Sequence, residues 1–311
     1  MREASYISLC RTGEIYERIK KAKELMNPCR ICPRLCGAKR LEGEKGFCKT
    51  GAKAFVSSAL PHFGEEEPLV GKMGSGTIFI THCNLRCLFC QNFEISHLGE
   101  GKEISNEEFA NIMINLQNRG CHNINFVTPT HVVPQILEAL PLAVEKGLKV
   151  PLVYNTGGYD MRETISLLDG VFDIYMPDIK FSDNLVASKY LNVDDYWERV
   201  KEAVKEMHRQ VGDLALDEDG IAYKGLLIRH LVMPEDLAGT KEVMRFLAKE
   251  ISKNSYVNIM DQYRPCGYAH RYPEISRGIT RSEYLKAIES AREEGITRLD
   301  KRTGIRILRF F

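Results

Sequence analysis

From about Gly76 onward, short apolar runs rich in β-branched and aromatic residues alternate with longer amphipathic stretches. This alternation is the strongest constraint on the fold, because it is typical of βα units whose strands pair in parallel. The apolar runs are nearly continuous, as expected for strands that are covered on both faces. We expect six strands, at residues 77–81, 123–127, 150–154, 172–176, 225–232 and 256–260.

Between these strands, apolar residues recur every three or four positions, which predicts amphipathic helices. Ser105 with Glu108 three residues later forms a capping box, and Gly120 and Gly147 follow helix ends. The segment 212–220 ends in Asp-Gly and predicts a turn or a small hairpin. We expect helices at 105–118, 133–145, 196–211, 241–253 and 282–294, with a shorter one after Asp160.

Right-handed crossovers would curl these units into an open barrel or a strongly twisted sheet, with too few strands for an eight-unit barrel. The expected fold class is therefore α/β, an open (partial) six-unit βα barrel with an N-terminal cysteine-rich metal-binding extension. The expected segments are residues 1–72 for the extension, 73–265 for the barrel, and 266–311 for a loop, a helix and a strand that complete the domain.

Composition narrows the range of partners. The 311 residues include 43 Lys+Arg and 42 Asp+Glu, a formal charge of +1, so a nucleic-acid partner is not expected. No apolar run approaches the ~20 residues that span a bilayer, and the first thirty residues show no signal-peptide core. We expect a cytoplasmic protein without a membrane partner, in which clustered cysteines hold metal more often than they form disulfides.

Seven of the ten cysteines fall into two groups. The second group, Cys83, Cys87 and Cys90, follows the first expected strand directly with the spacing C-x3-C-x2-C. An iron-sulfur cube has four irons, so three cysteines leave one iron open to another ligand. A structural zinc site would need a fourth protein ligand, for which His82 is the nearby candidate. We therefore favour an iron-sulfur cluster over zinc here.

The first group has four cysteines with the spacing C-x2-C-x3-C-x11-C, and the stretch around it is rich in proline and glycine. Four thiolates are a complete set for a closed zinc site or for an auxiliary iron-sulfur cluster, and the spacing does not decide between them. The members of this group are Cys29, Cys32, Cys36 and Cys48.

Polar residues interrupt the apolar strands at their C-terminal ends, where βα barrels gather their chemistry. Asp178 and Lys180 lie two residues apart, a complementary pair for a zwitterionic amino-acid ligand, or else a buried salt bridge. His131 is an acid-base candidate or a structural histidine, and His230 is expected to pack against a helix. The strand-end polar residues are Thr128, Thr130, Asn155, Asp178, Lys180, Arg229 and Gln262.

The C-x3-C-x2-C motif after a first barrel strand, with Phe89 just before the last cysteine, resembles the radical S-adenosylmethionine enzymes. The resemblance implies a 4Fe-4S cluster on Cys83, Cys87 and Cys90, whose open iron chelates S-adenosylmethionine. One electron then splits this cofactor and yields a 5′-deoxyadenosyl radical, which takes a hydrogen atom from a substrate. Phe89 would pack near the adenine, or else belong simply to the core.

Within that family, the chain is similar to the pyruvate formate-lyase activating enzyme, and in particular to an iron-sulfur protein branch that is named after this enzyme. The segment "PDIK" matches, at Asp178 and Lys180, an Asp-x-Lys that contacts S-adenosylmethionine, and Arg229 matches a fifth-strand arginine. The family's sixth-strand histidine falls at Arg264. Its Gly-Gly-Glu turn is replaced by "TPTH", so Thr128 or Thr130 would take the cofactor's amino group.

This resemblance implies an electron donor such as ferredoxin or flavodoxin, and a protein substrate whose glycyl residue loses a hydrogen atom. It also favours iron-sulfur over zinc for the N-terminal cysteines. Radical modification of a small molecule or of another side chain stays open. From a different class, so does a non-catalytic zinc or iron-sulfur protein that senses redox state or acts as a scaffold.

The three scattered cysteines carry less information. Cys266 follows the last expected strand, where a loop could cover the barrel mouth, and a radical relay, a third-site ligand and an inert thiol are all open, with the inert thiol favoured. Cys10 and Cys121 are interpreted as packing residues.

Overall fold

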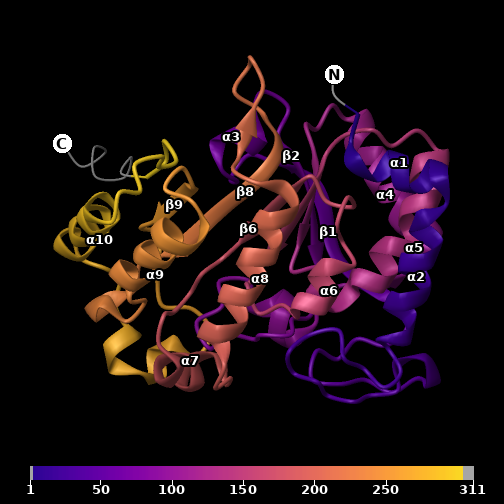
Figure 1. Ribbon diagram of the computed structural model, residues 1–311. Coiled ribbons are helices and arrows are strands. Elements are labelled where there is room, and N and C mark those ends of the chain that lie inside the picture. The colour runs from indigo at the N-terminus through magenta and orange to yellow at the C-terminus, as the bar shows by residue number, and fades with distance from the viewer. Residues whose placement is uncertain (1–2, 304–311) are drawn as a thin grey trace.

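The computed structural model describes residues 3–303. Within that range, nine strands form a sheet ordered β3-β1-β2-β4-β5-β6-β8-β7, with β9 also paired to β8 (Figure 1). The strands are β1 Ala54–His62, β2 Ser75–Ile80, β3 Lys102–Ile104, β4 Ile124–Val127, β5 Leu152–Thr156, β6 Ile174–Pro177, β7 Ala215–Leu216, β8 Ala222–Leu231 and β9 Tyr256–Met260.

The strands expected from the βα pattern lie together in this sheet. β2, β4, β5, β6, β8 and β9 pair in parallel in that order. β7 forms a short antiparallel hairpin with β8, which confirms the turn predicted at residues 212–220. The mixed α/β class is confirmed, and the sheet is consistent with an open barrel whose parallel strands all end at one edge.

The sequence pattern did not predict β1 or β3. β1 lies within residues 1–72 and pairs antiparallel with β2, while β3 pairs antiparallel with β1. Two serines and a proline interrupt the apolar character of β1, whose outer half is exposed because it is covered on one face only. The antiparallel pair therefore extends the sheet beyond its βα units.

Ten α-helices surround the sheet in the described range. Ser105 caps α4, because its hydroxyl accepts a hydrogen bond from the Glu108 amide while the Glu108 carboxylate accepts one from the Ser105 amide, which confirms the predicted capping box. The helices are α1 Ser5–Thr12, α2 Glu14–Glu24, α3 Glu67–Val70, α4 Asn106–Asn118, α5 Val133–Glu145, α6 Arg162–Ser166, α7 Asn184–Leu191, α8 Tyr196–Val211, α9 Thr240–Phe246 and α10 Arg281–Glu293.

The helices cover the sheet in neighbouring groups. α1 contacts α2, α2 contacts α5, and α5 contacts α4 on one side, whereas α9 and α10 pack together at the opposite end (Figure 1). α9 continues into one π-helical turn at Leu247–Ile251, where the expected helix 241–253 changes geometry. The expected short helix after Asp160 is α6.

β4 shows how alternation separates the two faces of the sheet. Phe126 points to the helix side, where its ring meets those of Phe109 in α4 and Phe172 at centroid distances of 5.8 and 5.9 Å. Val127, the next residue, faces inward and lines a cleft. Inward side chains near the C-terminal strand ends are therefore the ones that can reach a ligand.

Two expectations concern the chain's ends and the membrane. Of the loop, helix and strand expected in residues 266–311, the structure shows the helix, α10, and no strand within residues 266–303, while residues 304–311 lie outside the described residues. Among residues 3–303, no helix is long and apolar enough to cross a bilayer.

Candidate active site and a second cysteine pocket

A cleft of ≈ 360 Å³ opens at the C-terminal ends of the parallel strands. It joins residues as far apart in the sequence as His62 and Gln262, because parallel strands end at the same edge of the sheet. Ten of the eleven site residues that were expected for the cluster and S-adenosylmethionine line it: Cys83, Cys87, Cys90, Phe89, Thr128, Asn155, Asp178, Lys180, Arg229 and Gln262.

The three cysteines belong to the loop that leaves β2. The Leu85 amide donates a hydrogen bond to Cys83 Sγ at 3.2 Å, and the Ser96 hydroxyl donates one to Cys90 Sγ at 3.1 Å. Burial raises the pKa of all three thiols, while these donors, and Lys180 beside Cys87, work in the opposite direction. The donors fit thiolates bound to metal, because metal binding displaces the thiol protons.

Four charged or polar side chains continue from this loop along the cleft wall. Lys180 Nζ lies 2.7 Å from Asp178 Oδ2, and Arg229 Nε lies 2.7 Å from Asp178 Oδ1. Arg229 Nη2 also donates a hydrogen bond of 2.6 Å to Asn155 Oδ1. Asp178 is thus held between two cations, so the salt bridge and the ligand-binding interpretations of the pair are compatible.

Asp178, Lys180 and Arg229 determine one another's charge states. Burial alone would raise the pKa of Asp178, but Arg229 and Lys180 lower it below its ordinary value. Burial opposes the charged forms of Lys180 and Arg229, and the Asp178 carboxylate raises the pKa of both. The group therefore stays ionised near neutral pH, and it presents one anion and two cations to the cleft.

Three further expected residues lie around the cleft. Phe89 is 5% exposed and packs edge-on against Phe181 and Tyr263, so it serves the core and the cleft wall together. Thr128 has a left-handed backbone with φ of 64°, and its amide donates to the Asn155 carbonyl at 2.8 Å. Gln262 is exposed at the rim, where its carbonyl accepts a hydrogen bond from Gln91.

Thr130 is not among the described residues that line the cleft. Its hydroxyl donates to Asp160 at 2.7 Å, and the Tyr154 and Thr156 hydroxyls donate to the same buried carboxylate. Thr130 therefore belongs to a buried network behind β5. Arg264 also lies outside the cleft lining and is exposed.

Two buried carboxylates were missed by the sequence analysis. Glu65, which lines the cleft, lies 3.5 Å from Arg229, and Glu66 accepts a hydrogen bond of 2.9 Å from Asn258. Burial raises the pKa of both, to about 7 for Glu66. In sequence, "GEEEP" resembles an exposed acidic loop, so no local signal distinguished these two residues from Glu67, which is exposed.

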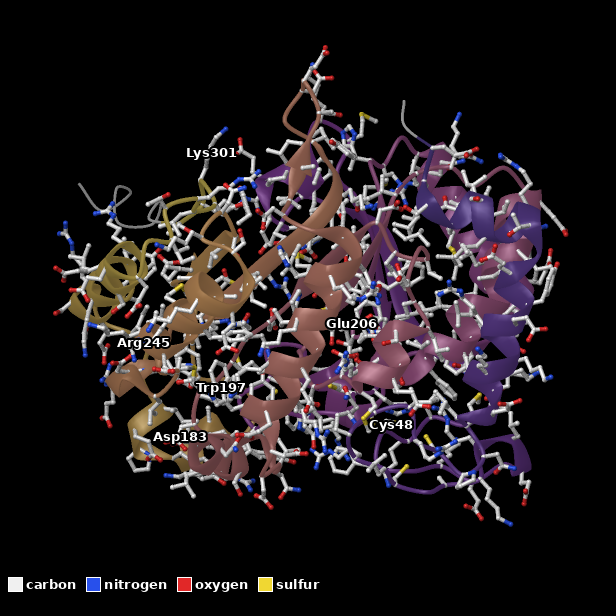
Figure 2. The ribbon with its side chains drawn as sticks, viewed as in Figure 1. Cys48, Asp183, Trp197, Glu206, Arg245 and Lys301 are labelled. Atoms are coloured by element: carbon white, nitrogen blue, oxygen red, sulfur yellow. The ribbon has the colours of Figure 1, made fainter. Side chains whose placement is uncertain are left out.

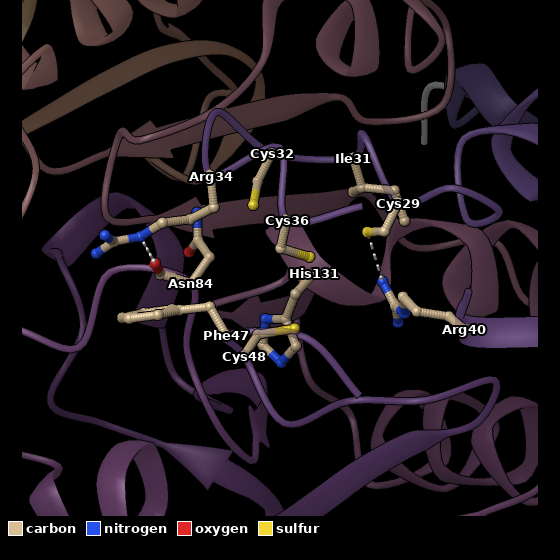
Figure 3. Close-up of a pocket in the computed structure, with 10 residues that line it drawn as sticks. All are labelled: Cys29, Ile31, Cys32, Arg34, Cys36, Arg40, Phe47, Cys48, Asn84 and His131. Atoms are coloured by element: carbon tan, nitrogen blue, oxygen red, sulfur yellow. Dashed lines mark hydrogen bonds between the residues drawn. The ribbon is translucent and has the colours of Figure 1, made fainter. Parts of the chain in front are cut away.

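The N-terminal cysteines line a second, much smaller pocket of ≈ 10 Å³ (Figure 3). Cys48 lies in the irregular loops beyond α2 (Figure 2). The guanidinium of Arg40, 1% exposed, donates two hydrogen bonds to the Gly51 carbonyl and approaches Cys29 Sγ at 3.9 Å. Arg40 thus supplies a buried positive charge beside the sulfur atoms, which stabilises thiolates.

The four thiols point into this pocket from different turns of the loop. In the described range, no three His, Cys, Asp or Glu side chains converge closely enough to hold a single metal ion. A tetrahedral zinc ion with Zn–S distances of about 2.3 Å requires such convergence. The thiolates of a cluster bind different iron atoms and lie farther apart, so the arrangement fits a cluster better.

The two cysteine groups are directly connected. Arg34, between Cys32 and Cys36, donates hydrogen bonds to the carbonyls of Asn84 and Leu85, which lie between Cys83 and Cys87. Asn84 also lines the small pocket. The loops that carry the two groups therefore pack against each other.

His131, His230 and Cys266 differ in their surroundings. His131 lines the small cysteine pocket and is away from the cleft lining. His230 is buried and contacts Thr240 at the start of α9, which confirms that it packs against a helix. Cys266 does not line the cleft, but it lies close enough to Cys90 for its charge to raise the Cys90 pKa.

Comparison with known proteins agrees with this geometry. Residues 77–247 match the Radical SAM superfamily. The chain is 34% identical over 284 residues to "Uncharacterized protein MJ0674" of Methanocaldococcus jannaschii, an alignment covering 88% of this chain and 77% of that protein. It is 28% identical over 176 residues to "Uncharacterized protein MJ0808" of the same organism, covering 51% and 50%.

The chain belongs to the radical SAM superfamily. It is therefore a radical SAM enzyme, and members of this superfamily use a 4Fe-4S cluster and S-adenosylmethionine. The names of the two relatives do not mention a substrate.

Proposed function

We propose that Cys83, Cys87 and Cys90 hold the 4Fe-4S cluster and that the cleft beside them binds S-adenosylmethionine. The observation that carries this proposal is the convergence of three thiols and the Lys180–Asp178–Arg229 group on one cleft. When bound, the cluster and S-adenosylmethionine supply the electron and the 5′-deoxyadenosyl radical with which a hydrogen atom is abstracted.

The chain's own residues bind and orient the cofactor. Lys180 and Arg229 attract its carboxylate, while Asp178 and the Asn155 amide oxygen accept hydrogen bonds from its amino group. The left-handed backbone at Thr128 turns that residue toward the cleft, in place of the family's glycine turn. Phe89 supplies an apolar surface for the adenine ring, and Gln262 closes the rim.

We infer an activity similar to that of the pyruvate formate-lyase activating enzyme, with a glycyl residue of a partner protein as the substrate and ferredoxin or flavodoxin as the electron donor. The match of "PDIK" and Arg229 supports this branch. Modification of a small molecule or of another side chain is the alternative. Thr128 and Arg264 favour it, because they depart from the activating enzyme at the second and sixth strands.

We also propose that the N-terminal cysteines hold an auxiliary iron-sulfur cluster, and that residues 1–72, 73–265 and 266–311 are the extension, the six-unit partial barrel and its C-terminal completion. The spread of the four thiols supports a cluster in preference to zinc, and the buried Arg40 supports the thiolate form that either centre needs. The contact of Arg34 with the Cys83–Cys87 loop supports a role in electron relay or in holding that loop.

The test is anaerobic purification followed by quantification of iron, sulfide and zinc, with electron paramagnetic resonance of the reduced protein with and without S-adenosylmethionine. We expect about eight irons, of which about four disappear in a Cys83/Cys87/Cys90 triple Ala variant. The wild type should also release 5′-deoxyadenosine and methionine when reduced.

Other outcomes separate the alternatives. Metal without cleavage of S-adenosylmethionine would support the sensor or scaffold hypothesis and contradict ours. Among enzymatic substrates, transfer of deuterium from a labelled candidate into 5′-deoxyadenosine identifies the hydrogen donor. A glycine-labelled partner protein distinguishes glycyl activation from small-molecule modification.

A further inference from the structure

His131 lies between the two cysteine groups, in a 3-10 turn at Thr130–Val132 after β4. Its ring is 1% exposed, and Nε2 lies 3.0 Å from the Thr81 carbonyl oxygen. A carbonyl oxygen only accepts hydrogen bonds, so Nε2 carries the proton. Nδ1 therefore has a free lone pair.

That lone pair has no hydrogen-bond partner in the described part of the chain. A buried nitrogen without a partner is costly, and it calls for an explanation such as a bound ion. His131 lines the same pocket as the four N-terminal cysteines, and in the close-up its imidazole is drawn at the edge of this group, at Cys48 (Figure 3). The ring that carries the unpaired nitrogen thus lines the pocket proposed to hold metal.

The imidazole is also in the form that binds metal. A neutral ring with one nitrogen protonated toward a backbone carbonyl is the usual arrangement of a metal-binding histidine, since the second hydrogen bond fixes the tautomer and the ring orientation.

The pocket then offers five donors, one more than a zinc ion or a 4Fe-4S cluster takes from protein. The cysteines are not equivalent: Cys29, Cys32 and Cys48 are buried, whereas Cys36 is exposed. The exposed cysteine is the one that can be replaced at least cost.

We propose that His131 Nδ1 takes the place of Cys36 in the four-cysteine set named above and, with Cys29, Cys32 and Cys48, is a ligand of the N-terminal iron-sulfur cluster, so that Cys36 is dispensable. This inference rests on the proposed function only in that the pocket holds metal, and it does not depend on cleavage of S-adenosylmethionine. The same ring would then contact Thr81, two residues before Cys83, so one histidine would join the two centres.

The test isolates the N-terminal centre in the full-length Cys83/Cys87/Cys90 triple Ala variant. One sample is reconstituted anaerobically with iron and sulfide, and a second with zinc alone. X-ray absorption at the matching edge should detect a nitrogen ligand at about 2.0–2.1 Å beside sulfur at about 2.3 Å. The two samples also show which metal the pocket takes.

Matched variants test whether the nitrogen ligand detected by X-ray absorption comes from His131. His131→Gln keeps a donor near the Thr81 carbonyl but removes the ligating lone pair, so the nitrogen signal should disappear and metal affinity should fall at least about 10-fold. Cys36→Ser should retain the metal within about twofold, whereas Cys48→Ser should lose it, in keeping with the about 10-fold or larger loss expected for a ligand.

A sulfur-only ligand shell in the loaded protein, loss of metal in Cys36→Ser, or no metal in either sample would overturn the proposal. If His131→Gln does not fold, pulsed electron paramagnetic resonance of the wild type with 15N-histidine gives the same answer. In that case nitrogen hyperfine coupling at the auxiliary cluster supports the ligand, and its absence contradicts it. Failure of S-adenosylmethionine cleavage would leave these readouts unaffected.

Discussion

The two cysteine groups lie next to each other, yet they face different spaces. Cys83, Cys87 and Cys90 line a cleft of ≈ 360 Å³, whereas Cys29, Cys32, Cys36 and Cys48 line a pocket of ≈ 10 Å³. The first has three thiols and a wall of charged side chains. The second has four thiols, one buried arginine and one buried histidine.

This difference fits two roles: the cleft can exchange a bound cofactor, whereas the small pocket can retain a metal. A cofactor that binds and leaves needs room and polar groups that can pair with it, and the cleft has both. A small pocket with a complete donor set can hold a metal but has no room for a substrate. Both loops use left-handed residues beside their cysteines, at Leu35 and Lys49 in one and at His82 and Arg86 in the other.

The largest expected effect tests which group is catalytic. Cys87→Ala should reduce cleavage of S-adenosylmethionine to background. This loss is greater than the about 10–100-fold decrease expected when a residue that only hydrogen-bonds to a metal ligand is removed. Production of 5′-deoxyadenosine by the reduced enzyme measures it. Cys121→Ala, which removes a buried thiol outside both groups, is the control and should keep most of the activity. Equal loss of activity in Cys87→Ala and Cys121→Ala would show that both substitutions act by disturbing the fold.

The next effect tests the charged wall of the cleft. Asp178→Asn removes the shared carboxylate of Lys180 and Arg229, whose side chains are 15% and 17% exposed, and leaves Arg229 with Glu65 at 3.5 Å. The free energy of unfolding should therefore fall by about 3 kcal/mol, the lower end of the range for a broken buried pair. Urea denaturation of the loaded protein under anaerobic conditions measures it. The control Glu293→Gln breaks an exposed pair with Lys241 and should hardly move the midpoint. Similar midpoints for the two variants would contradict a buried, coupled group in the cleft.

A third prediction uses pH, because Glu66 is a buried carboxylate next to Glu65 of the cleft, whereas no carboxylate is among the described residues that line the N-terminal pocket. The folded-state pKa of Glu66, about 7, is above its ordinary value. The folded protein therefore binds the proton more tightly, and this stabilisation is complete below about pH 4.5 and is lost as the pH rises through 7. The loss should be about 3 kcal/mol.

Denaturation at pH 5 and pH 8 measures this difference. Glu66→Gln cannot titrate, so the decrease in stability between the two values should shrink, and Glu67→Gln, at an exposed position, should leave it unchanged. A Glu66→Gln protein with the wild-type pH dependence would show that another group is responsible.

The smallest effect concerns the feature that the two regions share. Lys49→Gly and Arg86→Gly each remove a side chain from a left-handed backbone, with φ of 57° and 55°. Each should raise the free energy of unfolding by about 1 kcal/mol or less, because the relief is partly offset by the flexibility of unfolded glycine. Thermal melts of the metal-free protein measure both, and a destabilising result at either position would indicate that its side chain makes stabilising contacts.

The cysteine spacing and the strand-end residues were predictable because they depend on local order. A strand followed by three cysteines places them at the end of that strand, and parallel pairing then brings Asn155, Asp178 and Arg229 to the same edge. Thr130 was assigned to the same edge but faces away, since alternation and the turn after β4 direct it to Asp160. The glycyl substrate, the electron donor and the cytoplasmic location stay predictions.

By itself, the sequence determined the α/β class, the parallel strands and the two sets of thiols, because periodicity and spacing are local properties. The tertiary structure alone decided that Glu65 and Glu66 are buried beside Arg229, that β1 extends the sheet, and that His131 belongs to the N-terminal pocket. These contacts join residues that are far apart in the chain. Burial and partner choice arise only when packing brings such residues together, so no local pattern encodes them.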